Sequence, residues 1–65
     1  MDNNLPTLRE KNDESQSDLA DAVDVTRQTI NAVERDRYNP SLELAFKLAA
    51  HYDSAIEDIF HWSPD

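Results

Sequence analysis

Residues 15–36 of the chain read SQSDLADAVDVTRQTINAVERD and contain its strongest structural signal. Apolar residues recur in this stretch at helical spacing in two runs, with a short break between them. The inward positions of the two runs are Leu19, Ala20, Val23, Ile30 and Val33. Ser15 and Thr26 are residue types favoured as helix N-caps, and Asp24 is a type that tolerates a left-handed turn. The stretch therefore predicts two short helices joined by a tight turn.

The residues before this stretch predict one further helix. Leu5 and Leu8 lie three residues apart and share one face of a helix over residues 5–11. Pro6 suits the first turn of that helix, because the N–H that proline lacks has no partner there. Residues 1–4 are expected to fray, as chain ends commonly do.

The residues after this stretch predict two more helices. The break Asn39-Pro40-Ser41 precedes a helix over residues 42–51. The expected apolar face of that helix is Leu42, Ala45, Leu48 and Ala49, flanked by Leu44 and Phe46. Ser54 is expected to start the last helix, with Glu57 completing a capping box. The apolar residues of that helix are Ile56, Ile59 and Phe60, and residues 61–65 follow as a tail.

No segment alternates as a half-buried strand does, so the sequence predicts an all-α, five-helix fold. Residues 1–65 are expected to form one domain with its core in residues 5–60. A domain this small has a thin core and little room for an enclosed catalytic cleft. The chain also has no glycine for a phosphate-binding loop and no cysteine for a disulfide or thiolate metal site. An enzyme is therefore not expected.

Metal binding and membrane insertion are not expected either. His51 and His61 lie ten residues apart, without the partner spacing of a zinc site. No apolar run approaches the length of about 18 residues that indicates a transmembrane helix. No export signal is visible, so the protein is expected in the cytoplasm, with no cofactor.

The order and spacing of the helices resemble the helix-turn-helix domain of the Cro and repressor family, also called the XRE family. The pattern of that family reads roughly S-Q-x-x-L-A-x-x-x-G-V-S-x-x-x-I-x-x-[IVWL]-E-x-G, and residues 15–36 follow it. Residues 39–45 (NPSLELA) and 56–60 (IEDIF) resemble the fourth and fifth helices of the family. The resemblance covers about residues 5–60 and implies a lambda-repressor-like fold.

Three residues depart from the pattern of the family. Asp24 and Asp36 stand where the family has glycine, and aspartate can take the left-handed conformation at modest cost. Glu14 stands where the family has an apolar residue before the Ser-Gln pair. A charge at this position is expected to weaken the small core or to turn outward.

The resemblance implies that residues 26–36 form a recognition helix whose first turn enters the major groove of double-stranded DNA. Arginine can pair with guanine O6 and N7, and glutamine with adenine N6 and N7. Asn31 lies four residues after Arg27 and shares its face. The residues expected to contact bases are Arg27, Gln28, Thr29 and Asn31. The chain is therefore expected to be a sequence-specific transcriptional regulator, acting as a repressor or autoregulator.

The resemblance also implies contacts with the DNA backbone. The family grips a phosphate with the glutamine that opens its second helix, which here is Gln16. The other residues expected near phosphates are Thr26, Arg35, Arg37 and Tyr38. Residues 26–38 carry a local net charge of +1, so the rest of the chain carries −9. An arginine of the first helix pairs with a glutamate of the third in the family, and Arg9 and Glu34 match those positions.

Plainer interpretations stay open for the same side chains. Arg27 and Gln28 are also compatible with an ordinary solvated helix surface. Arg35 and Arg37 lie next to two acids and are also compatible with a local set of ion pairs.

The overall acidity runs against DNA binding at low salt, because duplex DNA is a dense polyanion. The chain has a net charge of −8 and a pI near 4.4, which resembles proteins of extreme halophiles. The Debye length is only about 3 Å at 1 M salt, so distant repulsion is screened there. A halophilic regulator should therefore show a shallow dependence of DNA affinity on salt.

The C-terminal region holds apolar surface beyond what one copy is expected to bury. The residues expected in a homodimer interface are Tyr52, Phe60, His61 and Trp62. Such regulators usually pair, because one domain covers only one half-site. The alternative function is a protein-interaction module, such as an antitoxin-like partner that binds a basic protein through its acidic face.

Overall fold

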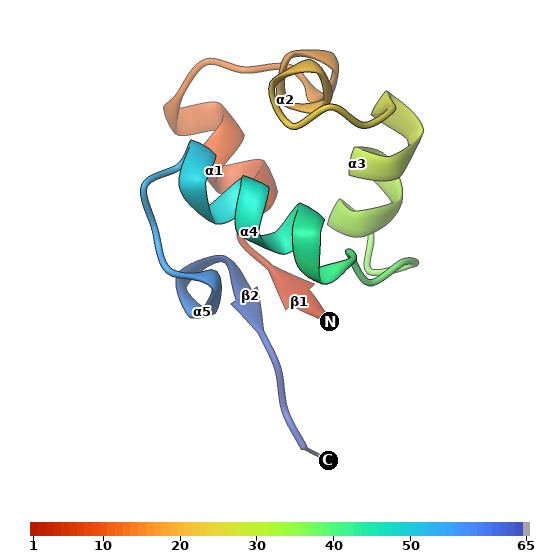
Figure 1. Ribbon diagram of the computed structural model, residues 1–65, viewed down its shortest axis with the longest axis vertical. Helices are drawn as coiled ribbons and strands as arrows, with labels where there is room; N and C mark the ends of the chain where they lie inside the picture. Colours follow the sequence, from red (N-terminus) through yellow and green to blue (C-terminus); the bar gives the residue numbers. More distant parts are fainter. Residues whose placement is uncertain (65) are drawn as a thin grey trace.

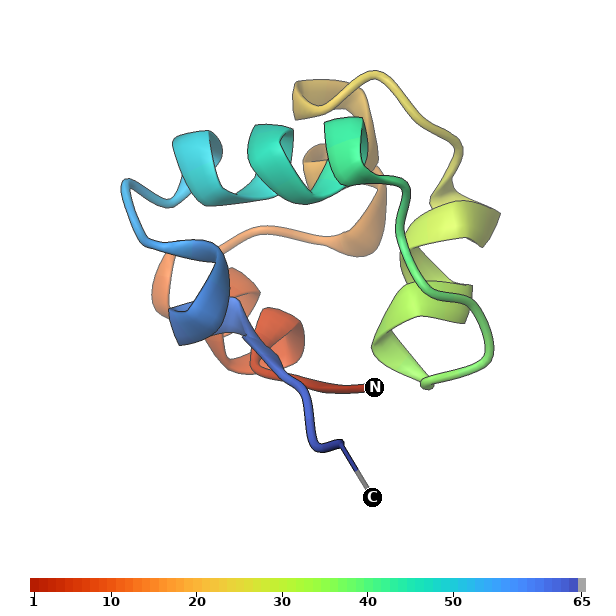
Figure 2. The same cartoon turned by 60° about the horizontal axis from the view of Figure 1, so that its bottom comes forward.

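The computed structural model describes residues 1–64 and confirms the all-α, five-helix class (Figure 1). In chain order the elements are β1 (Asp2–Asn3), α1 (Leu5–Lys11), α2 (Gln16–Ala22), α3 (Arg27–Glu34), α4 (Leu42–His51), α5 (Ile56–Ile59) and β2 (Phe60–His61). Figure 2 shows α4 spanning the molecule, with α3 on one side and α5 on the other. None of the helices within residues 1–64 is long and apolar enough to cross a membrane.

All five helices contribute to one apolar core. Each supplies one side chain with no exposed surface, and these are Leu5, Leu19, Ile30, Leu48 and Ile59. Fully burying a side chain of this size stabilises a fold by about 1.5–3 kcal/mol relative to leaving it exposed. Phe60 closes the core from β2 and is 6 % exposed. Because Leu19 anchors α2 and Ile30 anchors α3 near the middle of each helix, the core fixes how these two helices are rotated.

The expected apolar face of α4 was wrong at one position. Leu44, Ala45, Leu48 and Ala49 are buried, whereas Leu42 is 71 % exposed. The spacing of Leu42 from Ala45 fits a shared face, but Leu44 fits the core equally well by spacing. The packing of α4 against the other helices turns Leu44 inward, and Leu42 faces solvent together with Phe46.

The N-caps of α2, α3 and α4 are the hydroxyl residues Ser15, Thr26 and Ser41. Ser15 forms a full capping box with Asp18, as the sequence predicts. The expected start of the last helix at Ser54 was wrong. Ala55 precedes α5, and its N–H donates to the Asp58 carboxylate at 3.2 Å. The Ser54 hydroxyl instead donates to the Tyr52 carbonyl oxygen at 3.0 Å.

Four helices end in the same way, with an aspartate in the left-handed conformation. These residues are Asp13 (φ 55°), Asp24 (φ 60°), Asp36 (φ 61°) and Asp53 (φ 50°). After α2, for example, the Val25 N–H donates to the Ala20 carbonyl and the Asp24 N–H to the Asp21 carbonyl. This pair of bonds defines a Schellman motif, which usually places glycine at the left-handed position. Aspartate therefore replaces glycine at every such turn.

The two chain ends pair with each other, which corrects two expectations. Residues 1–4 were expected to fray and residues 61–65 to be a loose tail, but β1 and β2 form an antiparallel ladder. The Asn4 N–H donates to the Ile59 carbonyl at 2.8 Å and extends this contact. Strands of two residues are too short to show alternation, so the sequence pattern contained no signal for them. Asp65, the end of the expected tail, lies outside the described residues.

Glu14 turns inward and meets two polar side chains instead of an apolar neighbour. One carboxylate oxygen accepts a hydrogen bond from the Tyr52 hydroxyl at 2.8 Å, and the other lies 2.6 Å from His51 Nε2. The Glu14 side chain is only 15 % exposed. A buried carboxylate is tolerable when it is hydrogen-bonded in this way. His51 at the end of α4 and Tyr52 at its C-cap therefore compensate the departure at residue 14.

This contact predicts a pH dependence at the alkaline end. Burial, and then the hydrogen bond to the Glu14 carboxylate, raise the pKa of the Tyr52 hydroxyl well above its ordinary value of about 10. The resulting stabilisation is complete below the unfolded pKa and is lost as the pH rises through the folded pKa. Glu14→Gln should therefore lower the pKa of Tyr52 in an absorbance titration of tyrosinate. A Tyr38→Phe background leaves Tyr52 as the sole tyrosine, and equal titration curves there would contradict the assignment.

Candidate nucleic-acid interface

The exposed face of the α2–α3 pair begins at the first turn of α3. Ile30 and Val33 are buried, which turns Gln28 toward solvent, and Arg27 lies beside the buried face on the first turn of the helix. Both residues are exposed, and no hydrogen bond or ion pair within residues 1–64 engages either side chain. A guanidinium and a carboxamide thus stand on the first two residues of an eight-residue helix. Both groups are free to contact a ligand.

Thr26 and Thr29 are engaged with each other at the same end of α3. Thr26 Oγ1 accepts a hydrogen bond from the Thr29 N–H at 3.2 Å, and the two hydroxyl oxygens lie 3.0 Å apart. This contact caps α3 and fixes its first turn. Thr26 remains exposed and Thr29 is half-buried. Capping is therefore the structural role of this pair, beside any contact with a ligand.

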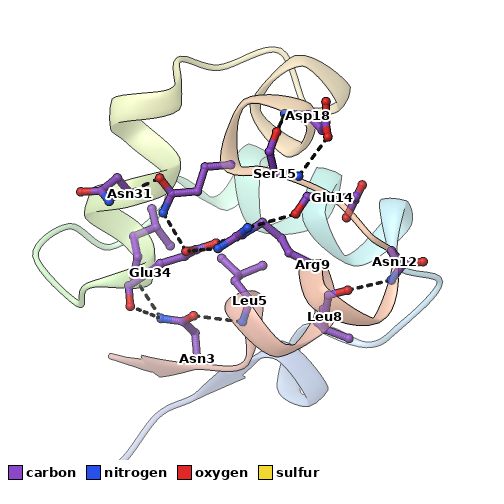
Figure 3. Close-up of polar contacts among 12 residues, drawn as sticks. Asn3, Leu5, Leu8, Arg9, Asn12, Glu14, Ser15, Asp18, Asn31 and Glu34 are labelled. Carbon is purple, nitrogen blue, oxygen red and sulfur yellow. Dashed lines mark hydrogen bonds and ion pairs between the residues drawn. The ribbon is translucent and has the colours of Figure 1, made fainter.

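A chain of polar contacts connects α1 to the outer face of α3 (Figure 3). Arg9 donates two hydrogen bonds to the Glu34 carboxylate, at 2.6 and 3.0 Å, and a third to the Glu14 carbonyl at 3.1 Å. The Gln16 amide donates to Glu34 Oε1 at 3.0 Å. Gln16 Oε1 accepts from Asn31 Nδ2 at 3.4 Å. The contacts thus join α1, the start of α2 and the middle of α3.

This network orients Gln16 and Asn31, which the sequence placed near phosphate and base. One N–H of the Gln16 amide is used by Glu34, and the other has no partner within residues 1–64. Asn31 uses an N–H toward Gln16, and its Oδ1 has no partner in that same part of the chain. Gln16 is thus left with a donor, whereas Asn31 has a free acceptor oxygen as well as its second N–H.

Asn3 is a structural contributor that the sequence did not reveal. Its amide donates to the carbonyl oxygens of Val33 and Glu34, at 3.0 and 3.4 Å, where α3 ends. Its Oδ1 accepts from the Leu5 N–H at 3.1 Å. Asn3 therefore ties the C-terminal end of α3 to the start of α1. A residue in a segment expected to fray offers no sequence signal for such a role.

Arg35, Arg37 and Tyr38 lie in the connection between α3 and α4, and all three are exposed. Asp36 in the same connection pairs with the N-terminal ammonium of Met1. Neither Arg35 nor Arg37 forms an ion pair with a carboxylate within residues 1–64. The two arginines are therefore free cations beside the end of α3.

The four residues expected in a dimer interface do not share one surface. Phe60 belongs to the core of its own chain, and the Tyr52 hydroxyl is bonded to Glu14. Only His61 and Trp62 are exposed, Trp62 by 73 %. The expectation was wrong for Phe60, because the pairing of β1 with β2 holds this side chain against the core.

Comparisons with known proteins place this arrangement in a family. Residues 7–59 match the family model described as Helix-turn-helix. An uncharacterized HTH-type transcriptional regulator of Methanocaldococcus jannaschii is 46 % identical over 65 residues, which cover 100 % of this chain and 98 % of that protein. A protein of Bacillus subtilis with the same description is 42 % identical over 60 residues, covering 92 % of this chain and 91 % of its own. With the helices in this order and the match over most of its length, the chain belongs to the XRE-type helix-turn-helix family.

Proposed function

We propose that this protein binds double-stranded DNA in a sequence-specific manner and regulates transcription as a homodimeric repressor or autoregulator. The observation that carries the proposal is the pair of free side chains, Arg27 and Gln28, at the exposed start of α3. The first turn of a recognition helix is the part that lies closest to base edges in the major groove. The names of the relatives as transcriptional regulators support the same function. Its place of action is then the cytoplasm, beside the chromosome.

The side chains of α3 suit different bases. Arg27 presents a fork of donors for guanine O6 and N7, and Gln28 a donor and an acceptor for adenine N7 and N6. Asn31 would act mainly through its free Oδ1, since one of the two N–H groups of its amide already donates to Gln16. An acceptor in the major groove fits the exposed amine of adenine or cytosine. Thr29, which is half-buried beside Thr26, would contact a thymine methyl group.

Backbone contacts would fix the register of the protein on DNA. The free N–H of Gln16 is available to a phosphate at the start of α2, and the Thr26 hydroxyl lies at the start of α3. Arg35, Arg37 and Tyr38 would hold the backbone beyond the end of α3. Arginine is well suited to phosphate because its planar donors match the oxygens.

Because its surface is so acidic, the protein would bind DNA in concentrated salt. Fourteen Asp and Glu against six Lys and Arg repel a polyanion at low ionic strength. Molar salt screens that repulsion within a few Å, whereas direct hydrogen bonds to bases persist. We therefore expect DNA affinity to depend only weakly on salt, as in a halophilic protein.

Selection of bound duplexes from a random library, at low and at molar salt, tests the proposal. The expected result is one enriched motif, with a guanine read by Arg27 and an adenine read by Gln28. Arg27→Ala should weaken binding by about 1–3 kcal/mol, roughly 5- to 150-fold, and relax one position of the motif. Lys11→Ala is the matched control, because Lys11 is an exposed cation at the end of α1.

The outcomes separate DNA binding from other functions. No motif at either salt concentration would refute DNA recognition and favour the protein-interaction alternative. A steep loss of DNA affinity with added salt would refute the interpretation that the acidic composition is an adaptation to a saline environment. Asn31→Ala should relax a position occupied by adenine or cytosine, and an unchanged motif would remove Asn31 from the readers.

A further inference from the structure

The outer face of α4 carries an unpaired apolar row. Leu42 is 71 % exposed, Phe46 is 59 % exposed and Ala50 is exposed as well. These three residues are four apart and lie along one side of the helix. The opposite side of α4 is already buried in the core. The two large apolar side chains therefore form one exposed apolar surface, of the kind that another protein can cover.

A shallow hollow lies at the C-terminal end of this row. It has a volume of about 400 Å³ and is formed by α4 and the end of α2. Its lining residues are Ala22, Val23, Asp24, Lys47, Ala50 and His51. Leu42 stands at the other end of the row, on the first residue of α4. The face therefore has a projecting apolar side chain at one end and a depression at the other.

Charges of opposite sign flank the row on one side. Glu43 and Lys47 follow Leu42 and Phe46 by one residue each, and their charged groups lie 3.6 Å apart. The order is acid toward the N-terminus and base toward the C-terminus. Reversing the direction of a second α4 would therefore set each acid opposite a base.

We propose that a second copy of this chain docks here, with its α4 antiparallel to the first. A two-fold axis through Phe46 brings the two Phe46 rings together and sets Leu42 of each copy over Ala50 of the other. Leu42 then fills the hollow beside Ala50, and this happens twice because such an interface is self-complementary. Glu43 of each copy faces Lys47 of the other, offset by about two residues, roughly 3 Å along the helix.

A second copy fits this face better than an unrelated partner does. The projecting Leu42, the hollow and the order of the charges all match a second copy after one two-fold rotation. Binding to an unrelated partner would not require this self-complementarity. This inference rests on the homodimer of the proposed function and identifies the surface through which the two copies pair. It also moves the interface away from His61 and Trp62. With a net charge of −8 on each copy, pairing should tighten as salt screens the repulsion.

Sedimentation equilibrium in molar salt, without DNA, tests this interface. The intact chain should sediment at twice its 7.5 kDa mass. Phe46→Glu should weaken pairing by about tenfold or more, because the buried aromatic contact is lost. The circular dichroism of this variant should be unchanged, since Phe46 lies outside the core. Trp62→Ala is the matched control, an exposed aromatic on the tail, and should still form the dimer.

Charge reversal gives a second, independent readout that does not perturb the core. Glu43→Lys and Lys47→Glu should each weaken pairing, because like charges then face each other. An equimolar mixture of these two variants should regain a dimer containing one copy of each. Failure of the mixture to pair, or a dimer that survives Phe46→Glu, overturns the proposal.

The remaining outcomes separate this interface from the function it serves. A monomeric intact chain in molar salt would refute both the interface and the homodimer. If Trp62→Ala alone abolished pairing, the α4 interface would be refuted, and the interface would lie on the C-terminal tail. A dimer formed through α4 in a chain that selects no duplex would refute DNA recognition and leave the interface standing.

Discussion

Arg9→Met is expected to lower the free energy of unfolding by about 3–5 kcal/mol, a large part of the stability of so small a domain. The Glu34 side chain is 5 % exposed and accepts two hydrogen bonds from Arg9. The hydrogen bond to Glu34, and then its negative charge, raise the pKa of the Arg9 guanidinium. Removing the arginine leaves a carboxylate without its cation in the interior, with Gln16 as its one remaining donor among residues 1–64. Urea denaturation followed by circular dichroism measures the loss.

The double variant Arg9→Met, Glu34→Leu shows how much of that loss comes from the stranded charge. Replacing both partners of a buried pair by apolar residues is often nearly neutral, so most of the stability should return. Full recovery is not expected, because Gln16 and the Glu14 carbonyl lose hydrogen bonds. If the double variant were as unstable as Arg9→Met, the effect would come from lost packing and not from an unpaired charge.

Replacing all four left-handed aspartates by glycine should stabilise the protein by about 2–4 kcal/mol in total. A residue with a side chain is strained in the left-handed conformation by roughly 1–2 kcal/mol, and glycine is not, although its flexible unfolded state offsets part of the gain. Each aspartate also places a negative charge at a helix C-terminus, where the dipole disfavours it. For a domain of this size the melting temperature should rise by about 10–25 °C.

Two comparisons divide this gain into charge and backbone contributions. Asparagine at residues 13, 24, 36 and 53 removes the charges and keeps the side chain, so this variant should gain stability only at low salt. At molar salt the dipole and charge effects are screened, and the glycine variant alone should remain more stable than the parent. Equal stability of all three proteins at molar salt would mean that these turns carry no backbone strain.

The helices were predictable because their signals are local. The caps Ser15 and Thr26 and the left-handed residues Asp24 and Asp36 act within one turn of their own helix. The error at the start of α5 has the same origin. Ser54 with Glu57 and Ala55 with Asp58 present the same spacing one residue apart, and in the folded chain the second pair opens α5.

The sequence predicted the exposed residues of the candidate site, but not the hydrogen bonds that connect its residues to other helices. The helical period turns Gln28 away from the buried Ile30 and Val33, whereas Arg27 lies three residues before Ile30, at the edge of the buried face, on the first turn of the helix. The partner of Asn31 lies 15 residues away on another helix, so no local pattern reveals that Gln16 holds its amide. The resemblance suggested the pair of Arg9 and Glu34, but the structure shows that Glu34 also accepts a hydrogen bond from Gln16.

Short-range preferences were thus sufficient for the five helices and for the caps of α2 and α3. They could not indicate that residues 2–3 pair with residues 60–61, that Glu14 meets His51 and Tyr52, or that Leu42 faces solvent. Each of these features joins parts of the chain that are distant in sequence or depends on how a helix is rotated. Spacing leaves such choices nearly equal in energy, and the burial of the shared core selects among them.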